Sequence, residues 1–243
     1  MSFFKMFLIC SLILGFCKEN KQPHQDHLTF LYEKAISVPE PSGLDLTFNK
    51  AGFWTVSDET STVYRLDGDG NVVQRIEVSG FDLEGITVVD ETKLVVILER
   101  SREVVMIDTN GSEIKRKKLP LEGEENSGIE GISYNSENGH YYLVNEKNPL
   151  LFIELDANFD IIKTDTLTFS KDVSGIYYDQ DNDKFWILSD EDQQIIQRDF
   201  NGNILKKFQL NIIQPEGITL DKKSHRLYIV SDAKETLYVF KIE

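Results

Sequence analysis

The sequence predicts an all-β fold, a β-propeller of four-stranded blades, and two observations carry that prediction. A segment that opens on a glycine recurs five times, and its leading glycines are Gly43, Gly85, Gly131, Gly175 and Gly217. The spacings of 42, 46, 44 and 42 residues match the length of one propeller blade. The first four copies also contain four short runs of β type each, and no segment shows a sustained helical stripe.

The four runs are clearest in the first copy, where they read "GLDLTF", "GFWTVSD", "TVYRLD" and "VVQRIEV". Polar or glycine-containing turns separate them, as expected of consecutive antiparallel strands. One such sheet cannot bury both of its faces, so neighbouring blades must cover it. We expect the large side chains of the second runs to supply that packing: Phe53, Trp54, Tyr141, Tyr142, Phe185, Trp186 and Tyr228.

The fifth copy ends after its third run, at "TLYVFKIE". Its fourth strand can come from "HLTFLYEKAISV", which precedes the first glycine. An N-terminal strand in that place closes the ring and removes an exposed sheet edge. The count therefore predicts five blades in a single domain over residues 28–243. A six-bladed ring is the alternative, and it would need the N-terminal piece and loops to form an irregular extra blade.

The first seventeen residues, "MSFFKMFLICSLILGFC", differ from the rest of the chain. Their apolar run is too short to span a bilayer comfortably and is typical of an export signal. Both cysteines of the chain, Cys10 and Cys17, lie in this segment 1–17, so the remainder has no disulfide framework. Residues 18–27 are polar and are interpreted as a tether.

Cys17 closes the apolar run after "LILGF" and resembles the acylated cysteine of a bacterial lipobox. Leu14 fits that pattern, whereas Phe16 is bulkier than the small residue that usually precedes the cysteine. The hypothesis is a lipid anchor on Cys17 that holds the domain at a membrane of the bacterial cell envelope, facing the periplasm or the cell surface. A plain cleaved signal and an uncleaved anchor are the alternatives.

Composition limits the classes of partner. The chain has 243 residues, 40% of them hydrophobic and 11% aromatic, which is enough for a real core. A formal charge of −15 argues against a nucleic-acid partner, because neutralising phosphates needs a basic face. The same charge attracts cations wherever carboxylates converge. The sequence has no G-x-S-x-G, H-E-x-x-H or phosphate-binding glycine loop.

Two conspicuous patterns are assigned to turns. "DGDGN" at 67–71 looks like the start of an EF-hand loop, but loop position twelve is Val78 rather than glutamate. Its equivalents "DTNGS", "DANFD" and "DFNGN" fall at the same repeat position, so hairpin turns explain all four better. His140 and His225 share another repeat position, in the turn before the second run.

Glutamates recur immediately before the repeated glycine. Glu84, Glu130 and Glu216 hold that position in three copies, and Ser42 and Ser174 hold it in the other two. The first strands of all blades line the central channel in the same direction, so these residues should form a ring. Carboxylates that meet there repel one another and raise one another's pKa values, and a Ca²⁺ ion would remove that cost. The alternative is that each glutamate caps a neighbouring backbone N–H.

Acidic residues also end the second runs, at Asp58, Glu99, Glu146, Asp190 and Asp232. We interpret them as structural, forming turn and inter-blade hydrogen bonds.

The openings "LEGITVV", "IEGISYN", "VSGIYYD" and "PEGITLD", behind a membrane-anchoring N-terminus, resemble the SdiA-regulated family of bacterial envelope β-propellers. The resemblance covers almost all of residues 28–243, and its motifs define repeats rather than catalytic residues. It implies a membrane-associated propeller that can hold calcium in its channel. More distantly, the segments look like those of phytase-like esterase and lactonase-type propellers. That likeness implies further metal ligands, for which Asn145 and Asp190 are candidates.

Two functional classes follow. The favoured one is a non-enzymatic envelope module that binds a small-molecule or protein ligand, with Ca²⁺ as a structural ion. The other is a calcium-dependent hydrolase of esters, lactones or phosphoesters, with the metal as Lewis acid and a carboxylate as base. No residue stands out as a dedicated nucleophile. The fold does not decide between the two classes, because propellers host both.

Overall fold

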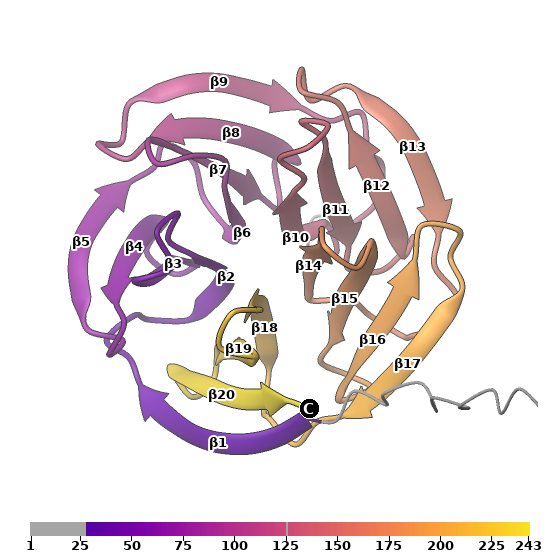
Figure 1. The fold of residues 1–243 in the computed structure, drawn as a ribbon. Coiled ribbons are helices and arrows are strands. Elements are labelled where there is room, and N and C mark those ends of the chain that lie inside the picture. Colours follow the sequence, from indigo (N-terminus) through magenta and orange to yellow (C-terminus); the bar gives the residue numbers. More distant parts are fainter. Residues whose placement is uncertain (1–27, 125) are drawn as a thin grey trace, which may run out of the picture.

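The protein is a closed ring of five β-sheets around a central axis (Figure 1). The computed structural model describes residues 28–124 and 126–243, which form twenty strands in five four-stranded sheets. The prediction of an all-β propeller with five blades is therefore confirmed. Within the two described ranges there is no helix long and apolar enough to cross a membrane. The predicted export signal, residues 1–17 with Cys17, and the predicted tether, residues 18–27, lie outside the described residues.

Each blade is a meander of antiparallel strands, numbered from the channel outward. Blade 1 contains β2 (Pro41–Leu46), β3 (Gly52–Ser57), β4 (Thr62–Asp67) and β5 (Val72–Glu77). Blade 2 contains β6 (Leu83–Val88), β7 (Lys93–Leu98), β8 (Glu103–Asp108) and β9 (Glu113–Lys118). Blade 3 contains β10 (Ile129–Tyr134), β11 (Tyr141–Asn145), β12 (Leu151–Leu155) and β13 (Ile161–Thr166). Blade 4 contains β14 (Gly175–Asp179), β15 (Lys184–Ser189), β16 (Gln194–Asp199) and β17 (Ile204–Gln209).

Blade 5 is built from both ends of the described chain. Its strands are β18 (Pro215–Asp221), β19 (Arg226–Ser231), β20 (Thr236–Ile242) and β1 (Leu28–Ala35). Strand β1 pairs antiparallel with β20, from Leu28 opposite Ile242 to Ala35 opposite Thr236 (Figure 1). The N-terminal strand thus closes the ring, as the truncated fifth repeat predicts, and it covers an edge that would otherwise template aggregation.

The core lies between blades, where the second strands present their large side chains. Trp54, Tyr142 and Trp186 are at most 4% exposed. Blades 3 and 4 meet through Tyr142 and Phe185, whose ring centroids are 4.9 Å apart in an edge-to-face arrangement. Burial of one such side chain contributes about 2–3 kcal/mol, so the contacts between blades are a major source of stability.

The hairpins carry the residues that the sequence assigned to turns. The Oδ1 atom of Asp67 accepts hydrogen bonds from the backbone N–H groups of Asp69 and Asn71 at 2.9 Å. Asp108, Asp156 and Asp199 receive equivalent bonds in their own blades. His140 lies in the β10–β11 hairpin, where its Nδ1 is 2.8 Å from Glu154 Oε1. The turn interpretation of "DGDGN" and its equivalents is confirmed.

The repeated glycines bring the five inner strands into contact. A Cβ atom on Gly217 would lie 2.6 Å from both the Leu44 nitrogen and the Ser42 carbonyl oxygen, in the next blade around the ring. A Cβ on Gly43 would lie 2.7 Å from the nitrogen of Ile86, and one on Gly131 would lie 2.9 Å from that of Ile176. No side chain fits between backbones at that separation, so only glycine permits this close approach. The glycine ring therefore closes the channel and separates its two ends.

Candidate metal centre

The side chains before the glycine ring gather at one end of the channel, where all inner strands begin; we call this end the mouth. A β-bulge places them there. In β6, Leu83 pairs with Leu98 and Gly85 pairs with Ile97, so Glu84 is the extra residue of the bulge. In β10 the same irregularity leaves Glu130 unpaired. A bulge redirects the side chain of its extra residue, and here it turns these carboxylates toward the mouth.

Glu84, Glu130 and Glu216 act on one another electrostatically, as the ring prediction requires. Burial raises the pKa of Glu130 well above its usual value, and the charges of Glu84 and Glu216 raise it further. Burial and the charge of Glu84 do the same to the pKa of Glu216. Glu84 also has a strongly raised pKa, although Ser42 of the neighbouring blade donates a hydrogen bond to it. The structure thus places the three predicted carboxylates in one shared environment.

The alternative interpretation, in which each ring glutamate caps a backbone N–H, is not supported by any hydrogen bond in the described residues. Within residues 28–124 and 126–243, no backbone N–H donates to the carboxylate of Glu84, Glu130 or Glu216. The serine position differs, because the Ser174 hydroxyl donates to the Pro215 carbonyl at 2.6 Å and so joins blades 4 and 5. The three ring glutamates are therefore partly buried, and within the described residues only Glu84 receives a hydrogen bond, from Ser42.

Further acidic side chains converge on this ring. Oxygen atoms of Asp82, Glu84 and Glu99 lie within 4.8 Å of one another, and so do oxygens of Glu99, Glu130 and Glu146. Glu99 belongs to both groups and links them. Burial and the adjacent Asp82 raise the pKa of Glu99 to about 7, although the Gly128 N–H donates to it at 2.7 Å.

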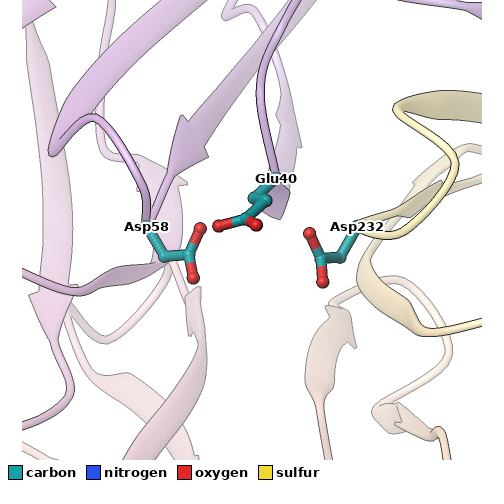
Figure 2. A group of neighbouring side chains, drawn as sticks. All are labelled: Glu40, Asp58 and Asp232. Atoms are coloured by element: carbon teal, nitrogen blue, oxygen red, sulfur yellow. The ribbon is translucent and has the colours of Figure 1, made fainter.

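A third group lies at the same mouth, between blades 1 and 5. Figure 2 shows the carboxylates of Glu40, Asp58 and Asp232 facing one another, from the segment before β2 and from the ends of β3 and β19. Their oxygens also lie within 4.8 Å of one another. Burial and the charge of Glu40 raise the pKa of Asp58 to about 7 and that of Asp232 to about 6.

Few cations offset these charges. Arg100 forms an ion pair with Asp82 at 3.0 Å, and Lys147 forms one with Glu146 at 2.6 Å. Neither contacts the ring glutamates. Ca²⁺ binds oxygen ligands at about 2.3–2.6 Å, so two of its ligand atoms can lie up to roughly 5 Å apart. The three groups satisfy that limit and supply only hard oxygen donors, so the residues present fit a Ca²⁺ ion.

The two weaker candidate ligands lie near the mouth with different roles. Asn145 is 1% exposed, and its amide nitrogen donates to the carbonyl oxygens of Ser127 at 3.0 Å and Pro149 at 2.9 Å. Its Oδ1 atom is buried without a hydrogen-bond partner. Asp190 receives a hydrogen bond from the Gln193 amide at 3.1 Å, and its charge helps to raise the pKa of Glu216.

The acidic residues that end the second strands have a double role. Glu99 forms the inter-blade bond to Gly128, and Asp190 forms a turn bond, so the structural interpretation holds for both. The same side chains also add negative charge to the mouth, which sequence reasoning underestimated. It missed Glu40, Asp82 and Asp172, which stand two residues before the ring position in blades 1, 2 and 4. Comparing that repeat position across the copies would have revealed them.

Comparison with known proteins agrees with this architecture. The SdiA-regulated family matches residues 22–241. A streptogramin B lyase structure aligns with a TM-score of 0.55 at 17% identity, over 88% of this chain and 72% of that one. Virginiamycin B lyase from Staphylococcus aureus aligns with a TM-score of 0.54 at 16% identity, over 89% and 74%. Kuenenia stuttgartiensis hydrazine synthase aligns with a TM-score of 0.55 at 14% identity, over 78% and 61%. At these identities the likeness to solved structures shows the fold alone.

Proposed function

The chain belongs to the SdiA-regulated family, and we propose that it is a Ca²⁺-binding, membrane-anchored module of the bacterial cell envelope. The observation that carries the proposal is the accumulation of acidic side chains at one mouth. Three ring glutamates meet there with eight further carboxylates: Glu40, Asp58, Asp82, Glu99, Glu146, Asp172, Asp190 and Asp232. Such a cluster is costly in a folded protein unless a cation or protons neutralise it.

One ion could contact the most carboxylates near Glu99, because Glu99 belongs to two of the three acidic groups. Glu84 and Glu130 approach Glu99 from the inner strands of blades 2 and 3, and Asp82 and Glu146 approach from the flanking loops. An ion held by these side chains would neutralise their charge and cross-link two blades. The group of Glu40, Asp58 and Asp232 would serve a second ion between blades 1 and 5.

The anchor proposal gains an orientation from the topology. Strand β18 starts at the mouth, so β20 runs away from the mouth and β1 runs back toward it. Leu28 consequently lies beside Ile242 on the side opposite the mouth. A lipid on Cys17 and a tether over residues 18–27 would attach the disc by that side. The acidic mouth would then face away from the membrane, available to a ligand or a partner protein.

A calcium-dependent hydrolase is the second candidate, and one observation favours it. The pKa values of Glu99 and Asp58 are raised to about 7, where a carboxylate becomes an effective general base. A bound Ca²⁺ would supply Lewis-acid polarisation of the scissile group. The lyases with the same fold illustrate that propellers support enzymes, but at 16–17% identity they supply no residue roles for this chain. We favour the binding module because no residue of the sequence stands out as a dedicated nucleophile.

Calorimetric titration of EDTA-stripped protein with CaCl₂ tests the metal proposal. We expect heat of binding and a raised melting temperature, and we expect Glu130→Gln and Glu84→Gln to weaken binding at least about tenfold, because each removes a charged ligand. Glu137→Gln is the matched control, since Glu137 is an exposed glutamate in the β10–β11 hairpin, away from the mouth. Absence of both heat and a melting shift would refute the proposal.

Two further measurements separate the remaining elements of the proposal. Turnover in an ester, lactone and phosphoester screen that EDTA abolishes would establish the hydrolase, and absence of turnover in a protein that binds Ca²⁺ would support the module. Detergent-phase partitioning of the wild-type chain, lost in Cys17→Ala, would support the lipid anchor. Equal partitioning of both proteins would refute acylation at Cys17.

A further inference from the structure

The opposite end of the channel, which we call the far end, contains a second cavity. Its volume is about 260 Å³, and the residues that define its chemistry are Asp45, Phe48, Thr87, Ser133, Tyr134 and Tyr177. Between this cavity and the mouth, the space inside the glycine ring is only about 10 Å³, which is at most the room one water needs. The far end is therefore a cup of its own, separated from the acidic mouth.

The floor of the cup is a fixed polar network contributed by the residues two positions after the repeated glycines. Asp45 of blade 1 accepts hydrogen bonds from the Val88 N–H at 2.8 Å, the Thr87 hydroxyl at 3.2 Å and the Thr219 hydroxyl at 3.1 Å. The Leu46 N–H also donates to it, at 2.7 Å. Four donors bind this carboxylate and join blades 1, 2 and 5, so the floor is rigid, although burial still raises the pKa of Asp45 above its usual value.

Hydroxyl groups remain available above that floor. The Ser133 oxygen accepts from the Tyr178 N–H at 2.9 Å, which leaves the Ser133 proton for a ligand. Tyr177 occupies the same repeat position in blade 4, and within the described residues nothing forms a hydrogen bond to its hydroxyl. Ser133 and Tyr177 can each donate one hydrogen bond and accept another. These two hydroxyl groups thus offer paired, uncharged donors and acceptors to a ligand.

An aromatic ring stands at the rim. Phe48, at the tip of the β2–β3 hairpin, is 62% exposed. It lines the cup and also a neighbouring cavity of about 300 Å³, whose polar residues include Arg65, Glu91 and Asn110. An exposed phenyl group between two polar cavities provides an apolar platform with hydrogen-bonding groups on both sides.

We propose that this far-end cup binds a neutral saccharide, with one sugar ring in the cup and a second crossing Phe48 toward the neighbouring cavity. A sugar ring has an apolar face that packs on an aromatic side chain and an edge of hydroxyl groups that pairs with Ser133 and Tyr177. Among the described residues that line the cup, the charged ones are Lys50 and Asp45. Their charges are opposite, so the cup has no excess charge that would favour an anionic or a cationic ligand over a neutral one.

Saturation-transfer NMR on the full-length protein in EDTA tests the proposal, with cellobiose, maltose and N,N′-diacetylchitobiose as probes and glycerol as the reference for non-specific contact. At least one disaccharide should show transfer well above that of glycerol. Tyr177→Phe removes one hydroxyl and should weaken binding about three- to tenfold. Phe48→Ala removes the platform and should weaken it by a similar factor. Phe81→Ala is the matched control, because Phe81 is 82% exposed but precedes β6 at the mouth.

The outcomes are distinct from those that test the metal centre. Binding that persists in EDTA and in Glu130→Gln, and that falls in Phe48→Ala and Tyr177→Phe, would support the cup whether or not Ca²⁺ binds at the mouth. The proposal is overturned if no disaccharide exceeds glycerol. It is also overturned if both cup variants bind like the wild type, or if Glu130→Gln weakens binding as much as they do. Near-ultraviolet circular dichroism of each variant confirms that the fold is intact.

Discussion

Substitution of Gly217 by alanine tests the account of how the ring closes. The added Cβ would lie 2.6 Å from the Leu44 nitrogen, 2.6 Å from the Ser42 oxygen and 2.7 Å from the Gly43 carbonyl carbon. All three atoms belong to the backbone of blade 1, so no side chain can rotate away. Relief requires β18 and β2 to separate, although the hydrogen bonds of two blades hold them in place.

The magnitude follows from two opposing effects. Overpacking a dense interior costs about 1–3 kcal/mol, and rigid backbone neighbours place this site at the upper end. Alanine also reduces the conformational entropy of the unfolded chain, which stabilises the folded state by about 0.4–1 kcal/mol. The expected net loss in the free energy of unfolding is about 2 kcal/mol. With a urea m-value of about 3 kcal/mol/M, the midpoint should fall by about 0.7 M.

Urea denaturation followed by far-ultraviolet circular dichroism measures this change. Gly68→Ala is the control, because Gly68 is exposed in the β4–β5 hairpin and a Cβ there has one close neighbour, the Ala51 oxygen at 3.1 Å. Its midpoint should move by less than about 0.3 M, as for ordinary surface substitutions. If Gly217→Ala unfolds at the wild-type midpoint with an unchanged m-value, the inner strands do not meet at the glycines and the reasoning fails.

Three further predictions follow. Burial and neighbouring carboxylates raise the pKa values of Asp58 and Glu99 from about 4 to about 7, so the metal-free folded state binds protons more tightly than the unfolded chain. Its melting temperature in EDTA should therefore fall as the pH rises from about 4 to about 7.5, and saturating Ca²⁺ should remove that dependence. A melting temperature that rises with pH over this range would contradict the reasoning. Lys222→Met leaves the carboxylate of Asp179 without its cation; that carboxylate is 1% exposed and lies 2.5 Å from the Lys222 ammonium. Urea denaturation should show that the free energy of unfolding falls by about 2 kcal/mol, a value reduced from that of a fully buried pair because Lys222 is partly solvated. Adding Asp179→Asn to this variant should restore most of the lost stability if the ion pair is responsible. Removing residues up to Ala35 deletes β1 and exposes the edge of β20; light scattering should show dimers or aggregates, and a stable monomer would be evidence against ring closure by β1.

The candidate site was only partly predictable. Glu84, Glu130 and Glu216 were found from their shared repeat position, because equal positions in equal blades lie at equal depth around an axis. The bulge that turns Glu84 toward the mouth could not be read from β6 alone, because it is defined by how β6 pairs with β7. Glu40 and Asp82 were missed because the comparison of the copies stopped at the ring position, two residues after each of them. Their proximity to Asp58 and Glu99 comes from contacts between segments that are separate in the chain.

The sequence by itself determined the number of blades, the strands in each, the closure by the N-terminal strand and the place of the glycine ring. These features are local or periodic, so repeated turns, alternation and glycine spacing encode them directly. Only the tertiary structure decided how many carboxylates share the mouth, which pKa values rise as a result, and that the channel is closed between mouth and cup. Those properties depend on distances between atoms of different blades, which ring closure sets and no stretch of sequence contains.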